Sequence, residues 1–314
     1  MDELYETTVG VLLDPDQRVF WPGLLSAAVI AALAGGQLKR YVDPKLWAHP
    51  SALLDYQLLL ANAGIRILLV APLGLSAFAV AVGVADALDR WLGIPAAPDW
   101  PDALVTAAYS IVLFLVWDLS RYALHRLAHE VPALWEIHKV HHSAEVMTPF
   151  TFFRAHPVER FLFGLRGVLA TGLVAGVFFH FFRERAVQLE VLGVTAIGFV
   201  FNILGSNLRH SHVWLTYGRY VERVFLSPAQ HQIHHGAEAV EQRSNYGTWL
   251  AIWDWLGGSL RLANDATRPA RFGLSEADLN HDPHGLLSSL VGPLVAWTRR
   301  PRPPASAEPS KEVE

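Results

Sequence analysis

Cysteine is absent from this 314-residue chain, and charged side chains are scarce. Without thiols the protein can form no disulfide and hold no thiolate-ligated haem or cysteine-bound iron–sulfur cluster, so any metal must be bound by nitrogen or oxygen atoms. Charged residues make up 17% of the chain, against about 25% in soluble proteins, and hydrophobic residues make up 52%. This composition predicts a membrane protein. The net charge of -4 argues against a basic surface for nucleic acid.

Long apolar stretches interrupt the chain at intervals, and five of them approach the roughly 20 residues that a helix needs to cross a bilayer. The expected spans are 19–38, 67–88, 103–124, 161–182 and 186–206. One of them could instead be an interfacial helix, so we expect four or five transmembrane helices. The chain then divides into an acidic extracytoplasmic segment 1–18, one membrane-embedded domain 19–298, and a disordered cytoplasmic tail 299–314.

Histidines are concentrated in three short motifs: "HRLAH" at 125–129, "HKVHH" at 138–142 and "HQIHH" at 231–235. Residues three or four apart share one face of a helix, so each motif presents its imidazoles together. One such pair is common at protein surfaces, but three motifs predicted on one side of a membrane favour metal binding over stacked or proton-carrying histidines. Eight imidazoles exceed the four ligands of a zinc site and suit two metal ions. Imidazole itself does not distinguish iron, zinc and copper.

Basic residues indicate which side of the membrane these motifs occupy. Lys39, Arg40 and Lys45 follow the first apolar stretch, and the histidine motifs are surrounded by further arginines, whereas the loop 89–102 is acidic. Lysine and arginine collect on the cytoplasmic side. We therefore expect an all-α integral-membrane helical bundle with a cytoplasmic helical cap that carries the histidines, placed in the inner membrane of a bacterium.

The order HxxxH, HxxHH, HxxHH among membrane spans resembles the fatty acid hydroxylase/sterol desaturase superfamily of integral-membrane di-iron oxygenases. The blocks "WDLSRYALHRLAHEVPALWEIHKVHHSAE" (117–145) and "LSPAQHQIHHGAEAVEQRSNYGTWLAIWDWLGGSL" (226–260) carry the resemblance, so it covers the core 117–260. It implies that the iron ligands are His125, His129, His138, His141, His142, His231, His234 and His235. It also implies a further ligand between the second and third motifs, for which we favour His212 over His210 and rank His156 lower.

The resemblance further implies an oxidoreductase with two non-haem iron ions that uses dioxygen to hydroxylate or desaturate a lipid C–H bond. The sequence shows no fused haem or flavin domain, so electrons are expected from a separate ferredoxin-like or cytochrome b5-like donor with its reductase. The lipid is expected to enter from the bilayer, and sterol-like or hopanoid-like, fatty-acyl and ether lipids all remain open. The alternative is a membrane protein that binds metal or haem without catalysis or only carries electrons.

Several polar residues are candidates to accept hydrogen bonds from the outer ring nitrogens of such ligands. Asp118 lies two helical turns before His125 within an apolar span, where an ionisable side chain is usually functional. Asp254 in "IWDWLGG" resembles the closing aspartate of the superfamily. The remaining candidates are Glu130, Glu145 and Asn245, of which the two glutamates could equally serve as helix caps or surface ion pairs.

Overall fold

A computed structural model describes residues 10–15, 17–74, 76–186, 190–191, 194–279 and 282–299. Across these ranges the chain is helical, which confirms the predicted all-α class. The only strands in them are β1 (Glu190–Val191) and β2 (Val194–Thr195), which pair as an antiparallel hairpin. Most of the predicted acidic segment and of the predicted tail lies outside the described residues.

The helices differ widely in length. The α-helices are α2 Trp21–Leu33, α3 Leu38–Tyr41, α4 Pro44–Trp47, α5 Pro50–Ile65, α6 Ala77–Leu92, α7 Asp102–Glu130, α8 Pro132–His142, α9 Pro157–Phe182, α10 Ala196–Ile203, α11 Pro228–His234, α12 Ala239–Gln242, α13 Ile252–Gly257 and α14 Leu286–Thr298. A π-helix, η2, continues α5 over Arg66–Val70. The 3-10 helices are η1 Gly10–Leu12, η3 Ala71–Leu73, η4 Pro149–Phe153, η5 Arg183–Arg185, η6 Ser206–Arg209, η7 Val221–Arg223 and η8 Asp265–Thr267.

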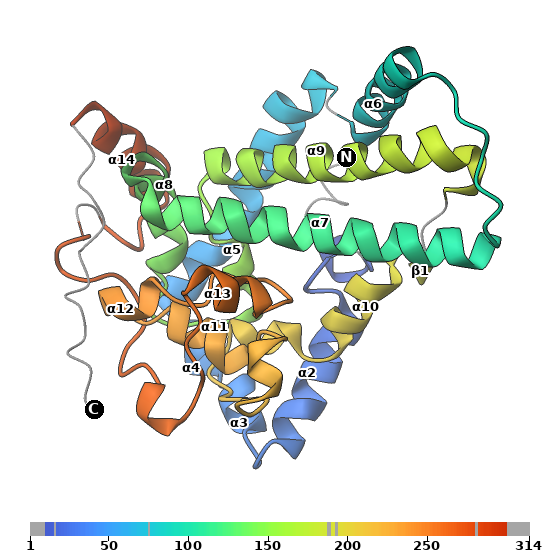
Figure 1. The fold of residues 1–314 in the computed structure, drawn as a ribbon. Coiled ribbons are helices and arrows are strands. Elements are labelled where there is room, and N and C mark those ends of the chain that lie inside the picture. Colours follow the sequence, from blue (N-terminus) through green and yellow to red (C-terminus); the bar gives the residue numbers. More distant parts are fainter. Residues whose placement is uncertain are drawn as a thin grey trace.

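Two long helices, α7 and α9, run side by side through the molecule, and α6 lies along α9 (Figure 1). Glycines allow this close approach: a Cβ atom on Gly172 would stand 2.5 Å from Val80 Cβ, and one on Gly176 would stand 2.6 Å from the carbonyl oxygen of Ala81. Small residues four apart let helices meet closely inside membranes. The spacing of Gly172 and Gly176 therefore fixes how α6 packs on α9.

Three helical stretches of the described chain are long and apolar enough to cross a bilayer: Pro50–Val70, Asp102–Glu130 and Pro157–Arg185. The second and third contain the spans predicted at 103–124 and 161–182. Large apolar side chains on this part of the molecule face outward, including Leu68 and Phe78, which are 74% and 77% exposed. Exposed apolar surface of this kind fits contact with lipid.

The structure differs from the sequence prediction at the other three stretches. The stretch 19–38 forms only the 13-residue α2, because Gly35 and Gly36 follow it with positive φ. Gly74, also at positive φ, breaks the stretch predicted at 67–88, so the long apolar helix there ends at Val70 instead. The stretch 186–206 contains the β-hairpin and the eight-residue α10.

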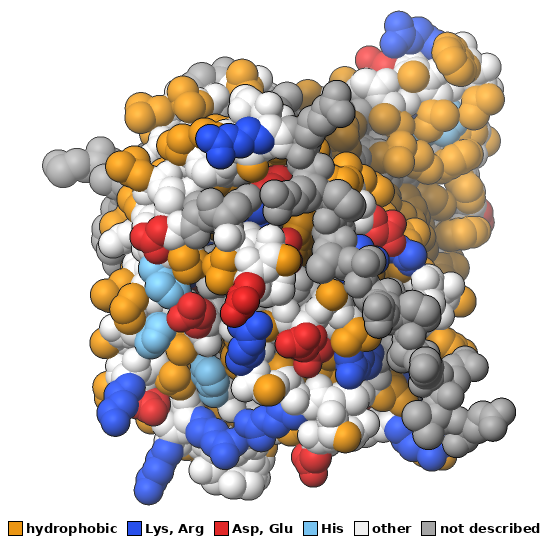
Figure 2. All heavy atoms as spheres, turned by 90° about the vertical axis from the view of Figure 1, so that its left-hand side faces the viewer, with side chains coloured by type: hydrophobic (Ala, Val, Ile, Leu, Met, Phe, Trp, Pro, Cys, Tyr) orange, Lys and Arg blue, Asp and Glu red, His pale blue; other side chains and the backbone are white. Residues whose placement is uncertain are grey.

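The short helices α8, α11, α12 and α13 gather at one end of α7 and α9, with α14 beside α8 (Figure 1). Buried side chains such as Trp135, Val140 and Ile233 form the core of this end. Figure 2 shows the end face, where charged and histidine side chains mix with hydrophobic ones. All three histidine motifs lie in this part of the fold.

Candidate metal centre

The first two histidine motifs come together through one sharp turn. His125 and His129 lie one turn apart near the end of α7, which ends at Glu130. Val131 then adopts an extended conformation, and Pro132 starts α8 at a position where proline is well tolerated. Helix α8 therefore folds back along α7 and brings His138, His141 and His142 beside the first pair.

The third motif is placed by α11, a helix that begins with a capping box. Ser227 accepts a hydrogen bond from the backbone N–H of Gln230, and the Gln230 side chain accepts one from the N–H of Ser227. The Gln230 amide also donates to the carbonyl of Glu222. These contacts fix the start of α11, so His231, His234 and the following residue His235 point toward the end of α7.

The imidazoles fall into two adjoining groups. The first cluster contains His125, His129, His138, His142 and His234, and within it the candidate ligand atoms all lie within 4.8 Å of one another.

The second cluster contains His141, His210, His231 and His235, under the same distance limit. The His142 and His235 rings stack with their centroids 4.6 Å apart, so the clusters are neighbours. The structure thus brings all eight histidines of the motifs together in two sets, each able to hold a metal ion.

Fixed acceptors define the tautomers in the first cluster. His125 Nδ1 lies 2.7 Å from the Tyr246 carbonyl, and His234 Nδ1 lies 2.8 Å from the Ser244 carbonyl. A carbonyl only accepts, so both Nδ1 atoms must carry the proton and donate. Each Nε2 atom is therefore left with a lone pair, which is the form that binds a metal.

The Nε2 lone pairs of His125 and His234 face one another. The Nε2 atom of His125 lies 3.1 Å from that of His138 and 3.1 Å from that of His234. Facing lone pairs repel unless a cation lies between them. Two imidazole nitrogens that bind one ion at about 2.1 Å and at a right angle would be about 3.0 Å apart, so the cluster fits a metal ion.

The second cluster brings ring nitrogens equally close together. His210 Nε2 lies 3.2 Å from His235 Nε2 and 3.0 Å from His231 Nε2. His141 Nδ1 donates to the Arg154 carbonyl at 2.9 Å, which leaves its Nε2 lone pair for a ligand. Among the described residues, the buried Nδ1 atoms of His231 and His235 have no hydrogen-bond partner. The donor set is wholly nitrogen, as iron, zinc or copper would accept.

Burial favours the neutral form of several imidazoles in the two clusters. It lowers the pKa of His141 to about 4 and that of His234 to about 3, and neighbouring His138 adds to both effects. It also lowers the pKa values of His210, His231 and His235 well below the ordinary value, with nearby imidazoles contributing. Neutral rings bind metal without first losing a proton.

Among the described residues, one carboxylate touches a histidine of the clusters, and it was not predicted from the sequence. Glu159, in the first turn of α9, lies 2.7 Å from His138 Nδ1, and both side chains are buried. Carboxylates commonly orient metal-binding histidines in this way. Its position after "RAHPV", at the start of a predicted membrane span, was the signal that could have found it.

Of the three histidines predicted as additional ligands, only one lies in a cluster. His210 belongs to the second cluster, whereas His212 lies outside both and accepts a hydrogen bond from the backbone N–H of Met147. His156 also lies outside: its Nδ1 accepts from Val158 N–H and caps α9, while its Nε2 lies 3.0 Å from the Leu290 carbonyl. The geometry therefore favours His210, the reverse of the sequence preference.

The two predicted aspartates hold backbone and indole groups, not imidazoles. Asp118 is buried in α7 and accepts hydrogen bonds from the N–H groups of Trp249 and Leu250 and from the Trp253 indole. Asp254 accepts from the N–H groups of Tyr246 and Gly247 at 2.8 and 2.7 Å. Because the Tyr246 carbonyl anchors His125, Asp254 supports that ligand through one intervening turn.

The remaining polar candidates lie further from the clusters. The Asn245 side chain donates to the carbonyls of Gln230 and Arg261, so it ties α11 to the segment that follows α13. Glu130 forms an exposed ion pair with Arg126 at 2.6 Å. Glu145 pairs with His284 at 3.1 Å and is half-exposed. The two glutamates therefore form surface ion pairs, which is the alternative role predicted for them from the sequence.

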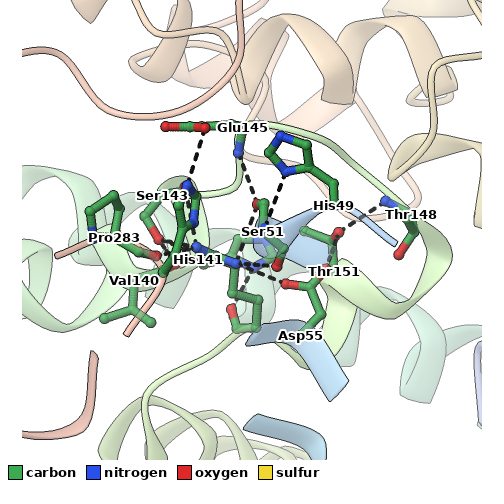
Figure 3. A network of polar contacts seen from close by, with 12 residues as sticks. His49, Ser51, Asp55, Val140, His141, Ser143, Glu145, Thr148, Thr151 and Pro283 are labelled. Carbon is green, nitrogen blue, oxygen red and sulfur yellow. Dashed lines mark hydrogen bonds and ion pairs between the residues drawn. The ribbon is translucent and has the colours of Figure 1, made fainter. Parts of the chain in front are cut away.

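A buried arginine fixes the backbone that anchors His141. Figure 3 shows His141 beside the labelled residues Ser51, Asp55 and Ser143, whose side chains point into one polar network. At its centre the Arg154 guanidinium is fully buried and lies 3.1 Å from a carboxylate oxygen of Asp55.

Arg154 has further partners around this ion pair. It donates to the carbonyls of Ser51, Val140 and Pro283 at 2.8, 3.1 and 2.6 Å. Arg154 thus ties together α5, α8 and the C-terminal segment. Its own carbonyl accepts the hydrogen bond from His141 Nδ1.

The part of the chain that carries both histidine clusters is similar to known proteins. The model of the fatty acid hydroxylase family matches residues 110–259. Ornithine lipid hydroxylase OlsE of Rhizobium tropici is 29% identical over 160 residues, which cover 51% of this chain and 44% of that protein. Alkylglycerol monooxygenase of Homo sapiens is 28% identical over 152 residues, covering 48% and 30%.

A third relative is a fungal enzyme. The Delta(7)-sterol 5(6)-desaturase ERG3B of Gibberella zeae is 31% identical over 155 residues, which cover 49% of this chain and 42% of that protein. The chain thus matches less than half the length of each of these relatives. No solved structure matches it. The matched part contains every histidine of the two clusters.

Proposed function

We propose that the protein is a membrane di-iron oxygenase acting on a lipid, because the model of the fatty acid hydroxylase family matches its histidine-rich region, residues 110–259. It would use dioxygen and electrons from a separate donor to hydroxylate or desaturate a C–H bond. The observation that carries the proposal is the pair of buried histidine clusters, in which Nε2 atoms of neighbouring rings lie 3.0 to 3.2 Å apart.

The ligand sets follow from the two clusters. The first ion would be held by five imidazoles and the second by four, with His210 included. Iron at these positions supplies the reduction of dioxygen and the oxidising strength to attack an unactivated C–H bond. In hydroxylation, one lipid C–H, one dioxygen, two electrons and two protons give C–OH and water. In desaturation, two neighbouring C–H bonds with the same reagents give C=C and two waters.

The chain itself contributes orientation and exclusion of water. Glu159 and the carbonyls of Tyr246, Ser244 and Arg154 hold the outer nitrogens, so each ring keeps one orientation during turnover. A cavity of about 390 Å³ adjoins the clusters and is lined by His125, His138, His141, His210 and His231. It lies against α7 and α9, the long apolar helices, so a lipid can reach it from the bilayer.

The position in the membrane determines where the electron donor and the lipid would meet the clusters. With lysine and arginine on the cytoplasmic side, the helical end that carries the clusters faces the cytoplasm of a bacterium. There a ferredoxin-like or cytochrome b5-like donor with its reductase would deliver electrons. Sterol-like, fatty-acyl and ether lipids share the apolar body that such a cavity needs.

The test is lipid oxidation under labelled dioxygen. Membranes of cells that express the full chain are incubated with ¹⁸O₂ and a reductase system, and the lipids are compared with those from cells expressing His141→Ala or His234→Ala. We expect a lipid product that carries ¹⁸O or a new double bond and that is absent in both variants, because each loses a ligand that no other residue replaces. An unchanged product in either variant would show that the clusters do not carry out the reaction.

A further inference from the structure

Arginine side chains share the cavity with the histidines. Besides imidazoles of both clusters, this cavity of about 390 Å³ is lined by Arg18, Arg121, Arg160, Arg166 and Arg209. Arg209 is buried and the other four are half-buried, whereas arginines are rarely buried unless they are paired. Five of them around one small cavity next to a candidate metal centre therefore require an explanation.

None of these arginines forms an ion pair with a described residue. Arg209 is 3% exposed, and its Nε atom has no hydrogen-bond partner among the described residues. Burial and the neighbouring charges of Arg209 and Arg121 lower the pKa of Arg18. The cluster of arginines is thus electrostatically unfavourable as it stands, and a bound anion would relieve it.

The two carboxylates close to the arginines are already engaged. Glu159 accepts a hydrogen bond from His138, and Asp118 accepts from two backbone N–H groups and from the Trp253 indole. Neither forms an ion pair with an arginine of the cavity. Five guanidinium groups and only two carboxylates, both already hydrogen-bonded elsewhere, give the cavity a net positive charge.

Neighbouring groups hold these guanidinium groups in place. Arg121 Nε donates to Thr248 Oγ1 at 3.0 Å. Arg166 donates to the Trp117 carbonyl at 2.8 Å and lies over the Trp117 ring at 4.4 Å, while its Nε atom has no hydrogen-bond partner among the described residues. Guanidinium groups fixed in this way bind carboxylate or phosphate without first losing side-chain freedom.

A second cavity continues from the first. Its volume is about 470 Å³, and it shares Arg18, Trp117, Arg121 and Phe152 with the first cavity. Beyond these residues its lining is mainly apolar and includes Leu113, Phe114, Ile197, Phe199 and Trp249. A hydrocarbon chain fits this lining, while a charged group attached to it would lie among the arginines.

We propose that the arginine-lined cavity binds the anionic group of a lipid substrate, a carboxylate or a phosphate, with its hydrocarbon chain in the adjoining apolar cavity. The substrate role rests on the oxygenase function proposed above, whereas the binding itself does not. The first cavity would be about 9 Å across if it were spherical. The carbon that reacts would therefore lie within about 9 Å of the anionic group, and not at the far end of the chain.

The competing explanation is structural: the arginines would only pack on aromatic rings and bind backbone carbonyls. It predicts that neutral and anionic amphiphiles of equal chain length bind alike. The test uses purified full-length protein in maltoside micelles, without added iron or reductant. Binding of radiolabelled hexadecanoate, hexadecyl phosphate and hexadecanol is measured at about pH 8, where both acids are ionised. The protein variants are Arg209→Gln and Arg166→Gln, with the exposed Arg219→Gln as the matched control.

We expect at least one anion to bind about tenfold or more tightly than hexadecanol, as one charge-assisted hydrogen bond provides. The preference should fall about tenfold in Arg209→Gln or Arg166→Gln and persist in Arg219→Gln. Preference for one of the two anions supports the proposal and identifies the source of the charge.

Equal binding of the three probes to the wild-type protein overturns the proposal, even if a variant fails to fold. A preference that survives in both cavity variants overturns it too. Because iron and reductant are absent, failure here would leave the oxygenase proposal standing, and a chain that oxidises no lipid could still show the anion preference.

Discussion

Replacing Asp55 by asparagine tests whether the Arg154 network holds the second cluster together. Both members of the ion pair are fully buried, their charged atoms lie 3.1 Å apart, and Asp55 also accepts a hydrogen bond from Thr151 at 2.7 Å. Asparagine keeps the shape but leaves the Arg154 charge without its counter-ion. Removing one partner of a buried pair costs about 3–5 kcal/mol.

The same change should weaken metal binding at the second cluster. The Arg154 carbonyl receives the His141 Nδ1 proton, so a displaced backbone at Arg154 releases that ring. Loss of such a support typically reduces metal affinity about 10–100-fold. The assay is thermal unfolding of the purified protein in detergent together with metal content per chain after dialysis, and the exposed Asp265→Asn is the control.

We expect Asp55→Asn to unfold at a lower temperature and to retain about one metal ion where the wild-type protein retains two, while Asp265→Asn behaves as the wild type. A variant that keeps both the wild-type unfolding temperature and full metal content would refute the role assigned to this network. Asp55 lies outside the region that matches the family model, so the test also asks whether the N-terminal helices serve the metal centre.

Three further changes test separate parts of the account. Glu159→Gln should lower metal affinity about 10–100-fold, because the His138 ring loses its carboxylate partner. Chelator competition measures the affinity, and a wild-type value would contradict the role of Glu159. His210→Ala should remove one metal ion per chain and His212→Ala none, measured by elemental analysis; the opposite result would restore the preference drawn from the sequence. Gly172→Ala should destabilise the protein by about 1–3 kcal/mol in a detergent unfolding assay, because its Cβ would lie 2.5 Å from Val80 Cβ. The control Gly83→Ala, which has open space around the Cβ, should leave the stability unchanged. Equal stability of the two variants would contradict the packing of α6 on α9.

The histidine clusters were the most predictable part of the structure. Spacings of three and four residues fix which side chains share a helix face, whatever the helix packs against. His125 and His129 therefore appear together on α7, and His138 appears beside His142 on α8. Outside regular helices this rule fails. His210 and His212 lie in irregular backbone, so their distance from His231 along the chain did not determine which one points into a cluster.

The groups that orient the rings were largely beyond sequence reasoning. Three of the four anchors of outer nitrogens are carbonyls, of Tyr246, Ser244 and Arg154, and every residue has a carbonyl. Asp118 was expected to accept hydrogen bonds from a ligand imidazole, but it holds the loop around Trp249 and Leu250, a pairing set only by the tertiary fold.

Helix limits were predicted approximately where an apolar run is unbroken, since the stretches 103–124 and 161–182 lie inside α7 and α9. They failed where glycine interrupts an apolar run, because hydropathy does not register backbone conformation. Gly74, at positive φ, is one such residue, and the glycine pair Gly35 and Gly36 after α2 is another. The long helix Pro50–Val70 begins in moderately polar sequence, so hydropathy placed the span too late in the chain.

The metal content of the full-length protein tests the central claim most directly. Protein purified from iron-supplemented cells is analysed for metal per chain, and Mössbauer spectroscopy of ⁵⁷Fe-labelled protein reports the environment of the iron. We predict two non-haem irons per chain with nitrogen-rich coordination, both lost when His141→Ala and His234→Ala are combined. A Soret band from haem, a single iron, or two zinc ions that iron cannot replace would contradict the account.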